Sequence, residues 1–305
     1  MTKHNDNQII VSISCITYNH APYIRQCLDG FLMQQTNFAY EVLIHDDAST
    51  DGTTEIIKEY EAKYPDIIKP IYEDENQWVK GRRGSAVFNF PRAKGKYIAM
   101  CEGDDYWTDS LKLQKQVDFL ETHDECSFCA HNFDLYNQDT ECLERVRRQA
   151  RDFTMEDLVT GDLPIQTATI LGRKESIDLD FCLRLPFAMD ATLFYQMLKC
   201  GKCRIFEDIM SVYRVHSSGI WSGALNVQHV DLRLRVVKSI YDIEQNNIAA
   251  RYLLNQYSKG VGRKWMIMNP TLNLKILDVC IKHFGVKKTL YFLYRKLFWG
   301  NNVVY

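Results

Sequence analysis

The sequence IIVSISCITYNH at residues 9–20 carries the clearest structural signal in the chain. Its first eight residues form a short run rich in β-branched side chains, which is typical of a strand buried on both faces of a parallel sheet. The run ends in Thr17-Tyr18-Asn19-His20, and Pro22 follows at an early helical position, where its missing N–H has no intrahelical partner anyway. We therefore predict a buried strand, a polar turn and a helix, as in an α/β protein.

The same alternation continues along the first third of the chain. Further strands are predicted at 40–44 (YEVLI), 67–72 and 96–101 (KYIAMC). Apolar residues at helical spacing predict helices after the turn DDASTDGT and from about 110 to 122. Strands that alternate with helices at this spacing favour a parallel sheet joined by right-handed crossovers.

The order of elements changes from about residue 125. Strands are expected at 126–136 and 166–171 without a short crossover helix between them, and a helix at 190–199 precedes a last strand at 209–215. Beyond residue 225 the pattern is helical. We expect a mixed, mostly parallel α/β sheet flanked by helices over residues 1–222, and a helical C-terminal extension over residues 223–305.

Composition excludes several classes of protein. The 305 residues carry a net charge of −2, so no global basic footprint for nucleic acid exists. The N-terminus MTKHNDNQ does not resemble a secretory signal, and 18 apolar residues never run together. The ten cysteines are scattered, which favours reduced thiols and a cytoplasmic location. Two CxxC pairs, 126/129 and 200/203, leave a shared zinc site as the less favoured alternative.

Polar clusters follow three of the predicted strands. They are Thr17-Tyr18-Asn19-His20, then His45-Asp46-Asp47, and then EGDDYW at 102–107. Open parallel sheets bind ligands at the carboxyl ends of their strands, and carboxylates gathered there repel one another unless a cation or donor groups are present. Hard oxygen ligands select Mg²⁺ or Mn²⁺. The motifs GxGxxG, GxxxxGKS/T, GxSxG and HExxH are all absent, which leaves a metal-bound nucleotide-sugar diphosphate as the expected ligand.

Four segments in order carry a resemblance to a known family. They are VSISCITYNHAPYIRQCLDGFLMQQ, YEVLIHDDASTDGTTEII, AKGKYIAMCEGDDYWTDSLKLQKQ and FAMDATLFYQMLKCGKCRIFEDIMSVYRVH. Together they cover roughly residues 9–217 and closely resemble the family-2 glycosyltransferases, which have the GT-A fold. The resemblance implies inverting sugar transfer from a nucleotide-sugar, usually with a divalent metal, Mn²⁺ or Mg²⁺.

The resemblance assigns the donor pocket to the first two polar clusters. Tyr18 is expected to stack on or flank the base, with Thr17 and Asn19 lining the same pocket. Asp47 matches the family residue that accepts a hydrogen bond from the base N–H. Because uracil carries such a donor, a UDP-sugar is the expected donor. Asp46 could equally orient the turn.

The resemblance also assigns the metal and diphosphate contacts. Asp105 is expected to be a direct metal ligand and Asp104 a ribose or indirect partner, while Glu102 stands where the family often has Asp and its role is open. His216 in YRVH matches a position where some members contact the metal or diphosphate, and the alternative is a structural histidine. Arg83 in KGRRG is expected to grip the diphosphate, and the alternative is a solvated basic loop.

Asp190 is the expected catalytic base, because it matches the acidic residue that the family uses on the acceptor side. A helix N-terminus keeps a carboxylate ionised, as proton abstraction requires, although aspartate is also an ideal simple helix cap. This chain has Met189-Asp190 where the family more often has a Glu-Asp pair. Acceptor specificity is expected to rest on residues 140–190 and Trp221.

The tail at residues 275–296 is basic and apolar in alternation. This composition suits a helix on an anionic membrane surface at the inner face, or binding of a lipid-linked saccharide acceptor. The alternative is a packing helix with a solvated basic face. We expect transfer to a saccharide or lipid-linked saccharide hydroxyl in cell-surface polysaccharide synthesis. A sugar nucleotidyltransferase and a non-catalytic sugar-binding protein of the same fold are the alternatives.

Overall fold

A computed structural model describes residues 8–81, 84–160, 165–185, 190–217, 227–245, 247–250, 281–282 and 285–287. The chain divides into two compact units, Met1–Leu158 with Asp162–Gly219, and Val159–Gly161 with Ile220–Tyr305. The division expected between residues 222 and 223 stays a prediction about domain organisation.

The first part of the larger unit follows the predicted alternation. Its elements are β1 (Ile9–Thr17), α1 (Ile24–Leu32), β2 (Ala39–Asp46), α2 (Thr53–Lys63), β3 (Ile68–Tyr72), α3 (Ser85–Phe88), the 3₁₀ helix η1 (Phe90–Arg92) and β4 (Tyr97–Met100). Each strand and each long helix predicted here is present, with ends shifted by one or two residues. The apolar periodicity of this part was therefore a sufficient guide to its elements.

The second part of the unit is less regular. Its elements are β5 (Tyr106–Trp107), α4 (Lys112–Thr122), β6 (Cys126–Asn137), β7 (Cys142–Val146), β8 (Arg151–Phe153), α5 (Met155–Thr160), the 3₁₀ helices η2 (Thr167–Thr169) and η3 (Lys174–Ser176), β9 (Leu171–Arg173), α6 (Leu179–Arg184), α7 (Asp190–Cys200) and β10 (Lys202–Val215). The last strand begins seven residues earlier than the predicted 209–215, and a bulged register near residues 206–211 interrupts its pairing with β6.

One element prediction is wrong. Residues 166–171 do not form a strand but the turn η2, followed by the short strand β9. Both the backbone N–H and the hydroxyl of Thr169 donate to the Gln166 carbonyl, at 3.0 and 2.7 Å, which closes the turn locally. Threonine can compete in this way with strand pairing, because its side chain offers the backbone a local hydrogen-bond donor.

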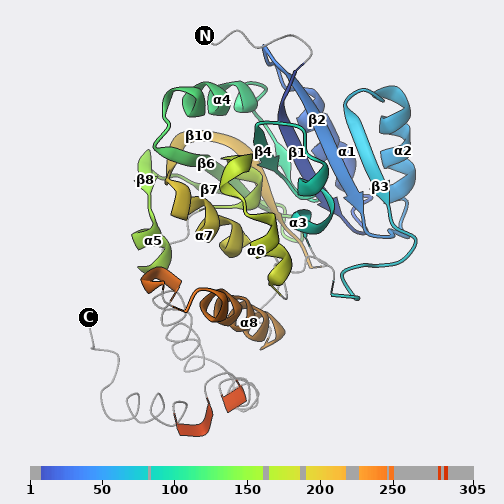
Figure 1. Ribbon diagram of the computed structural model, residues 1–305. Helices are drawn as coiled ribbons and strands as arrows, with labels where there is room; N and C mark the ends of the chain where they lie inside the picture. Colours follow the sequence, from blue (N-terminus) through green and yellow to red (C-terminus); the bar gives the residue numbers. More distant parts are fainter. Residues whose placement is uncertain are drawn as a thin grey trace. The chain divides into compact units, whose positions relative to one another are not determined.

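The strands form one mixed sheet in the order β3-β2-β1-β4-β9-β6-β10-β5, with β7 beside β6 and β8 beside β10 (Figure 1). The neighbours β3-β2-β1-β4 are parallel, as are β6 and β10. The short strand β9 is antiparallel to both β4 and β6 and joins the two parallel sets. This arrangement confirms the predicted mixed, mostly parallel sheet.

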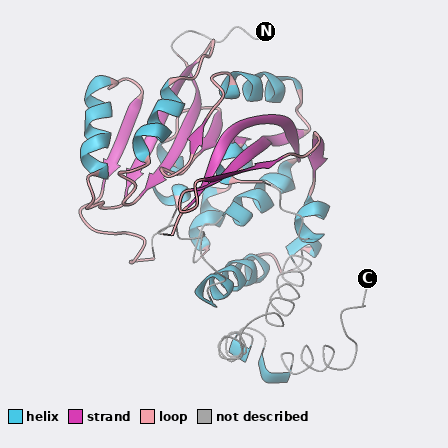
Figure 2. Ribbon diagram, turned by 180° about the vertical axis from the view of Figure 1, so that it is seen from behind, coloured by secondary structure: helices cyan, strands magenta, loops and turns pink. Residues whose placement is uncertain are grey.

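Helices cover the sheet and bury both faces of its central strands, as the two opposite views show (Figures 1 and 2). Seven of the nine residues of β1 are buried, including three serine or threonine residues. Helix α1 packs through Ile24, Cys27, Leu28 and Phe31, all fully buried. Such burial fixes the position of the strand ends, where the polar clusters begin.

Helix α8 (Val227–Ile243) belongs to the smaller unit. Val236, Val237 and Ile240 are buried on one stripe of it, as an amphipathic helix requires. Among the described residues, no helix is both long enough and apolar enough to cross a membrane. Most of the basic tail at 275–296 lies outside the described residues.

Candidate active site

The three polar clusters lie at the carboxyl ends of adjacent parallel strands. Thr17 at the end of β1 pairs in register with Asp46 at the end of β2, and the Asp47 N–H donates to the Thr17 carbonyl at 3.0 Å. The Gly103 N–H, in the loop after β4, donates to the Ile16 carbonyl at 3.0 Å. Hydrogen bonds from both neighbouring loops therefore hold the end of β1 between them.

Gly103 allows the loop 102–105 to lie directly on the end of β1. A Cβ atom at this position would lie 2.6 Å from Thr17 Oγ1 and 2.8 Å from Thr17 Cβ. Any side chain would therefore push the acidic loop away from the strand, which explains glycine in the middle of EGDDYW.

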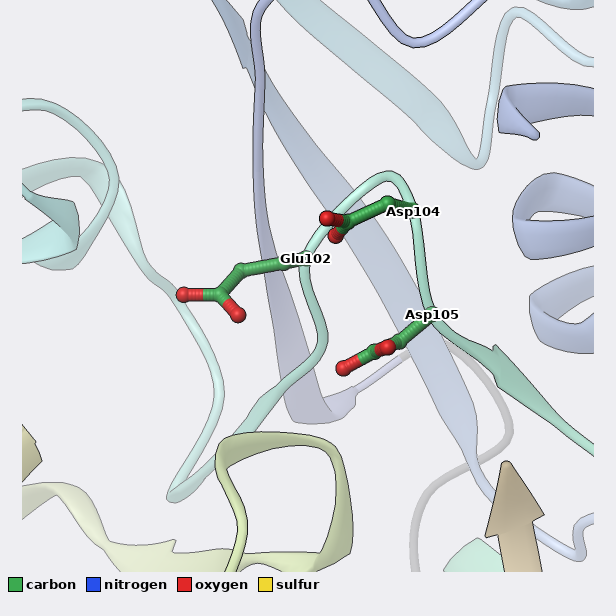
Figure 3. A group of neighbouring side chains, drawn as sticks. All are labelled: Glu102, Asp104 and Asp105. Atoms are coloured by element: carbon green, nitrogen blue, oxygen red, sulfur yellow. The ribbon is translucent and has the colours of Figure 1, made fainter. Parts of the chain in front are cut away.

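Three carboxylates of this loop form a candidate metal centre. One oxygen from each of Glu102, Asp104 and Asp105 lies within 4.8 Å of the other two. Figure 3 shows the three side chains turned to the same side of the loop. Such a set of hard oxygen ligands fits Mg²⁺ or Mn²⁺. Among the described residues, no other group of histidine, cysteine or acidic side chains is clustered in this way.

The electrostatics of the cluster explain why a cation would bind there. Burial raises the pKa of Glu102 well above its usual range, and the negative charges of Asp190, Asp104 and Asp105 raise it further. Burial and the charge of Asp104 likewise raise the pKa of Asp105. Without a cation the site would have to take up protons, so a divalent ion would compete for the same oxygens.

Asp104 lies between two histidines. Its Oδ2 is 3.1 Å from His216 Nε2 and 3.7 Å from His20 Nε2. Burial raises the pKa of the Asp104 carboxyl, but the His216 hydrogen bond and the charge of His20 outweigh burial and leave the pKa below its usual value. The structure thus brings His216 beside the predicted acid, and it adds His20 as a second imidazole.

Asp105 is the most deeply buried of the three acids, at 1% exposure. Its Oδ1 accepts a hydrogen bond from the Arg214 backbone N–H at 2.8 Å. The Arg214 guanidinium also donates to the Asp104 carbonyl at 2.8 Å and to the side-chain oxygens of Gln138 and Gln26. Arg214 therefore holds the backbone of the acidic loop, a role that its place in the sequence does not signal.

Asp47 has both of its oxygens engaged by the loop after β3. Oδ1 accepts from the Gln77 N–H at 2.6 Å and Oδ2 from the Trp78 N–H at 3.1 Å. A base N–H would share an acceptor with one of these amides, since each carboxylate oxygen has two lone pairs. Asp46 instead accepts from Ser49 and Thr54, so it orients the turn before α2.

The three residues after β1 differ in accessibility. Thr17 is 3% exposed and its buried Oγ1 has no hydrogen-bond partner, whereas Tyr18 is 44% exposed and can present its ring to a ligand. Asn19 has a positive φ of 55°, and its Oδ1 accepts from the Thr50 N–H at 2.8 Å. Arg83 and Trp221 lie outside the described residues.

Asp190 begins α7 and is exposed. Its Oδ2 accepts a hydrogen bond from the Thr167 hydroxyl at 2.7 Å. Its charge is one of the causes that raise the pKa values of Glu102, Asp105 and Tyr213. The charge of Asp190 therefore acts on the acidic loop, about 85 residues earlier in the chain. Thr167 and Tyr213 join the site without any signal in the sequence.

Comparison with known proteins supports the same family. The model described as glycosyl transferase family 2 matches residues 12–178. An uncharacterized protein of Mycobacterium tuberculosis is 38% identical over 216 residues, 70% of this chain and 61% of the relative, so the match spans about three fifths of that relative's length.

Two further relatives have more informative names. The putative teichuronic acid biosynthesis glycosyltransferase TuaG of Bacillus subtilis is 28% identical over 70% of this chain and 82% of its own length. The Escherichia coli UDP-Glc:α-D-GlcNAc-diphosphoundecaprenol β-1,3-glucosyltransferase WfaP is 35% identical over 37% of this chain and 42% of its own length.

The fold has solved counterparts. Staphylococcus aureus TarS, solved with UDP-GlcNAc, superposes with a TM-score of 0.66 at 15% identity, over 95% of this chain and 85% of that one. At this identity the likeness concerns the fold alone. With the family model matching more than half of the residues, the chain belongs to glycosyl transferase family 2.

Proposed function

We propose that this protein transfers a sugar from a UDP-sugar to a hydroxyl group of a saccharide or lipid-linked saccharide, with inversion at the anomeric carbon. The observation that carries the proposal is the cluster of Glu102, Asp104 and Asp105 at the carboxyl ends of the strands, together with the charge of Asp190, which raises the pKa of Glu102 and Asp105. Acids that hold a metal ion for the donor and a separate acid for the acceptor are what such a transfer needs.

The donor side is proposed to lie between the ends of β1 and β2. The exposed ring of Tyr18 would lie against the base, Thr17 and Asn19 would line the pocket, and Asp47 would accept from the uracil N–H. The names of WfaP and the TarS complex, which both include a UDP-sugar, support this choice of donor. Arg83 would contact the diphosphate.

Glu102, Asp104 and Asp105 would hold Mn²⁺ or Mg²⁺, with Asp105 as a direct ligand and His216 supporting it through Asp104 or as a further ligand. A divalent ion bound there supplies positive charge to a departing diphosphate.

Asp190 is proposed to remove the proton from the acceptor hydroxyl. The acceptor oxygen then forms a bond to the anomeric carbon as the bond from that carbon to the diphosphate oxygen breaks, and its electron pair leaves with UDP. One in-line displacement inverts the anomeric configuration, and no covalent sugar–enzyme intermediate is required. The proton on Asp190 is later released to water.

The acceptor is proposed to be a saccharide, free or lipid-linked, in the synthesis of a surface polysaccharide. The names of TuaG and WfaP support this class of acceptor. The basic and apolar tail at 275–296 would bring a cytoplasmic protein to the inner face of the membrane.

The proposal is tested by measuring UDP release from UDP-glucose and UDP-GlcNAc with Mn²⁺, first with water and then with undecaprenyl-diphosphate-linked GlcNAc as acceptor. We expect Mn²⁺-dependent release that stops with chelator and returns when excess Mn²⁺ is added. Donor binding without any turnover would favour a sugar-binding protein. Release of diphosphate from UTP and a sugar phosphate would favour a nucleotidyltransferase.

A further inference from the structure

The turn η2 lies against the candidate base, and its Thr167 hydroxyl donates to Asp190 Oδ2 at 2.7 Å. An exposed aspartate at the start of a helix can adopt several rotamers. A hydrogen bond from a fixed donor selects one of them and also stabilises the ionised carboxylate. The value of the Thr167 hydroxyl to the base therefore depends on how firmly η2 is held.

Two buried side chains hold η2 through consecutive carbonyls. Trp107 Nε1 donates to the Ala168 carbonyl at 2.9 Å, and Gln116 Nε2 donates to the Thr169 carbonyl at 3.0 Å. Trp107 is 2% exposed and Gln116 is fully buried. Side chains of the short strand β5 and of helix α4 thus take the place of a strand partner for η2.

Lys112 contacts both Trp107 and Gln116. It is fully buried, its Nζ donates to Gln116 Oε1 at 2.8 Å, and the same atom lies 4.0 Å from the centre of the Trp107 ring. A buried ammonium group is costly unless it is paired, so its contacts with both anchors indicate a structural task. Lys112 orients Gln116 and packs on Trp107.

The same tryptophan links η2 to the acidic loop. Trp107 stands two residues after Asp105 and packs edge to face on Phe31 of α1, with ring centres 4.8 Å apart. A displacement of the acidic loop would therefore move Trp107 and with it η2, and the Thr167 hydroxyl would then shift relative to Asp190. Trp107 is therefore one contact that the two sides of the site share.

We propose that Thr167 is a positioning residue for the catalytic base Asp190, with its hydroxyl held in place by the Trp107–Gln116–Lys112 support of η2. The inference rests on the proposed transferase function and deepens it, because it names the group that sets the geometry of the base.

Replacing Thr167 by valine keeps its shape and removes only the hydroxyl. With UDP-glucose or UDP-GlcNAc as donor, Mn²⁺, and water as acceptor, we expect Thr167→Val to lower kcat roughly 10- to 100-fold, the value of a hydrogen bond to a charged group. The KM for the donor should stay within about twofold of wild type, since the Thr167 hydroxyl donates to the proposed base and to no residue proposed for the donor pocket. Thr167→Ser should restore most of kcat.

Thr154 provides the matched control. Its hydroxyl donates to Asp157 Oδ2 at 2.9 Å, another threonine–aspartate bond but at the start of α5. Thr154→Val should leave kcat unchanged. An unchanged kcat in Thr167→Val, a donor KM that rises as much as kcat falls, or no recovery in Thr167→Ser would each overturn the inference. If Asp190→Asn has a lower kcat than wild type while Thr167→Val has the same kcat as wild type, the proposed function stands and the inference about Thr167 is wrong. A wild-type protein that releases no UDP would contradict both the proposed function and the inference.

Discussion

The acidic loop after β4 and the turn η2 carry the two sides of the same site but are held in different ways. Backbone hydrogen bonds to the end of β1, a glycine that permits close contact and the Arg214 side chain hold the acidic loop. Side chains from β5 and α4 hold η2. The donor side is therefore a product of sheet topology, and the acceptor side is a product of particular side chains.

The comparison predicts that damage to the acceptor side will spare donor binding. Asp190→Asn removes the base but leaves the acidic loop in place, so UDP release should fall at least about 100-fold, the lower end of what a general base contributes. UDP affinity measured by calorimetry should stay near wild type. The control is Asp178→Asn, because Asp178 caps α6 through the Phe181 N–H at 2.9 Å and asparagine caps a helix equally well. Equal loss of binding and turnover in Asp190→Asn would remove the residue from the base role.

Damage to the donor side should instead weaken the use of Mn²⁺. Arg214→Met removes the guanidinium bonds to the Asp104 carbonyl, Gln138 and Gln26 while keeping the length of the side chain. We expect the Mn²⁺ concentration for half-maximal activity to rise roughly 10- to 100-fold, as for other partners that orient metal ligands. Arg214→Lys should fall between wild type and Arg214→Met. An unchanged Mn²⁺ requirement in a folded Arg214→Met protein would show that the loop holds its own shape.

A substitution at Gly103, where the acidic loop touches Thr17, should have a smaller effect on the donor side. Gly103→Ala would place Cβ 2.6 Å from Thr17 Oγ1, so the loop must move. We expect a loss of roughly 1–3 kcal/mol in the free energy of unfolding, measured by denaturant titration, together with weaker Mn²⁺-dependent UDP binding. Wild-type stability and wild-type binding in this variant would contradict the close packing of the loop on β1.

The last effect concerns the support of η2 and depends on pH. Burial lowers the pKa of Lys112 to about 7 from 10.5. Between these values the unfolded chain binds more protons at this residue, so its cost to stability is largest below pH 7 and shrinks as pH rises, by at most about 1.4 kcal/mol per pH unit. Lys112→Met removes this group and keeps an unbranched side chain. The difference in unfolding free energy between Lys112→Met and wild type should move in favour of wild type between pH 6 and pH 9. A difference in unfolding free energy that stays constant over this pH range would contradict the burial of Lys112 and its lowered pKa.

The contrast also explains which parts could be predicted from the sequence. The strands up to residue 101 were predicted because each is a short, largely apolar run, and polar clusters follow three of them at the edge where parallel strands end. Glu102, Asp104, Asp105 and Asp190 were all identified in this way or through the family resemblance. The roles assigned to all of the site residues remain predictions, namely those of Thr17, Tyr18, Asn19, Asp47, Arg83, Asp104, Asp105, Asp190 and His216.

Residues 166–171 (QTATIL) were misread because they are rich in β-branched side chains, as strands are, while the contacts that decide their structure come from Trp107 and Gln116, more than 50 residues earlier. Arg214 and Thr167 were missed for the same reason. An arginine inside a strand and a threonine in a turn acquire their roles only through tertiary contacts, which local patterns do not report.

Binding of UDP to the wild-type protein and to Asp105→Ala, with and without Mn²⁺ in titration calorimetry, tests the acidic site most directly. Our account predicts that Mn²⁺ strengthens UDP binding to the wild type and that Asp105→Ala loses this gain while keeping its fold. UDP affinity that is indifferent to Mn²⁺ in the wild type, or a gain that persists in Asp105→Ala, would contradict it.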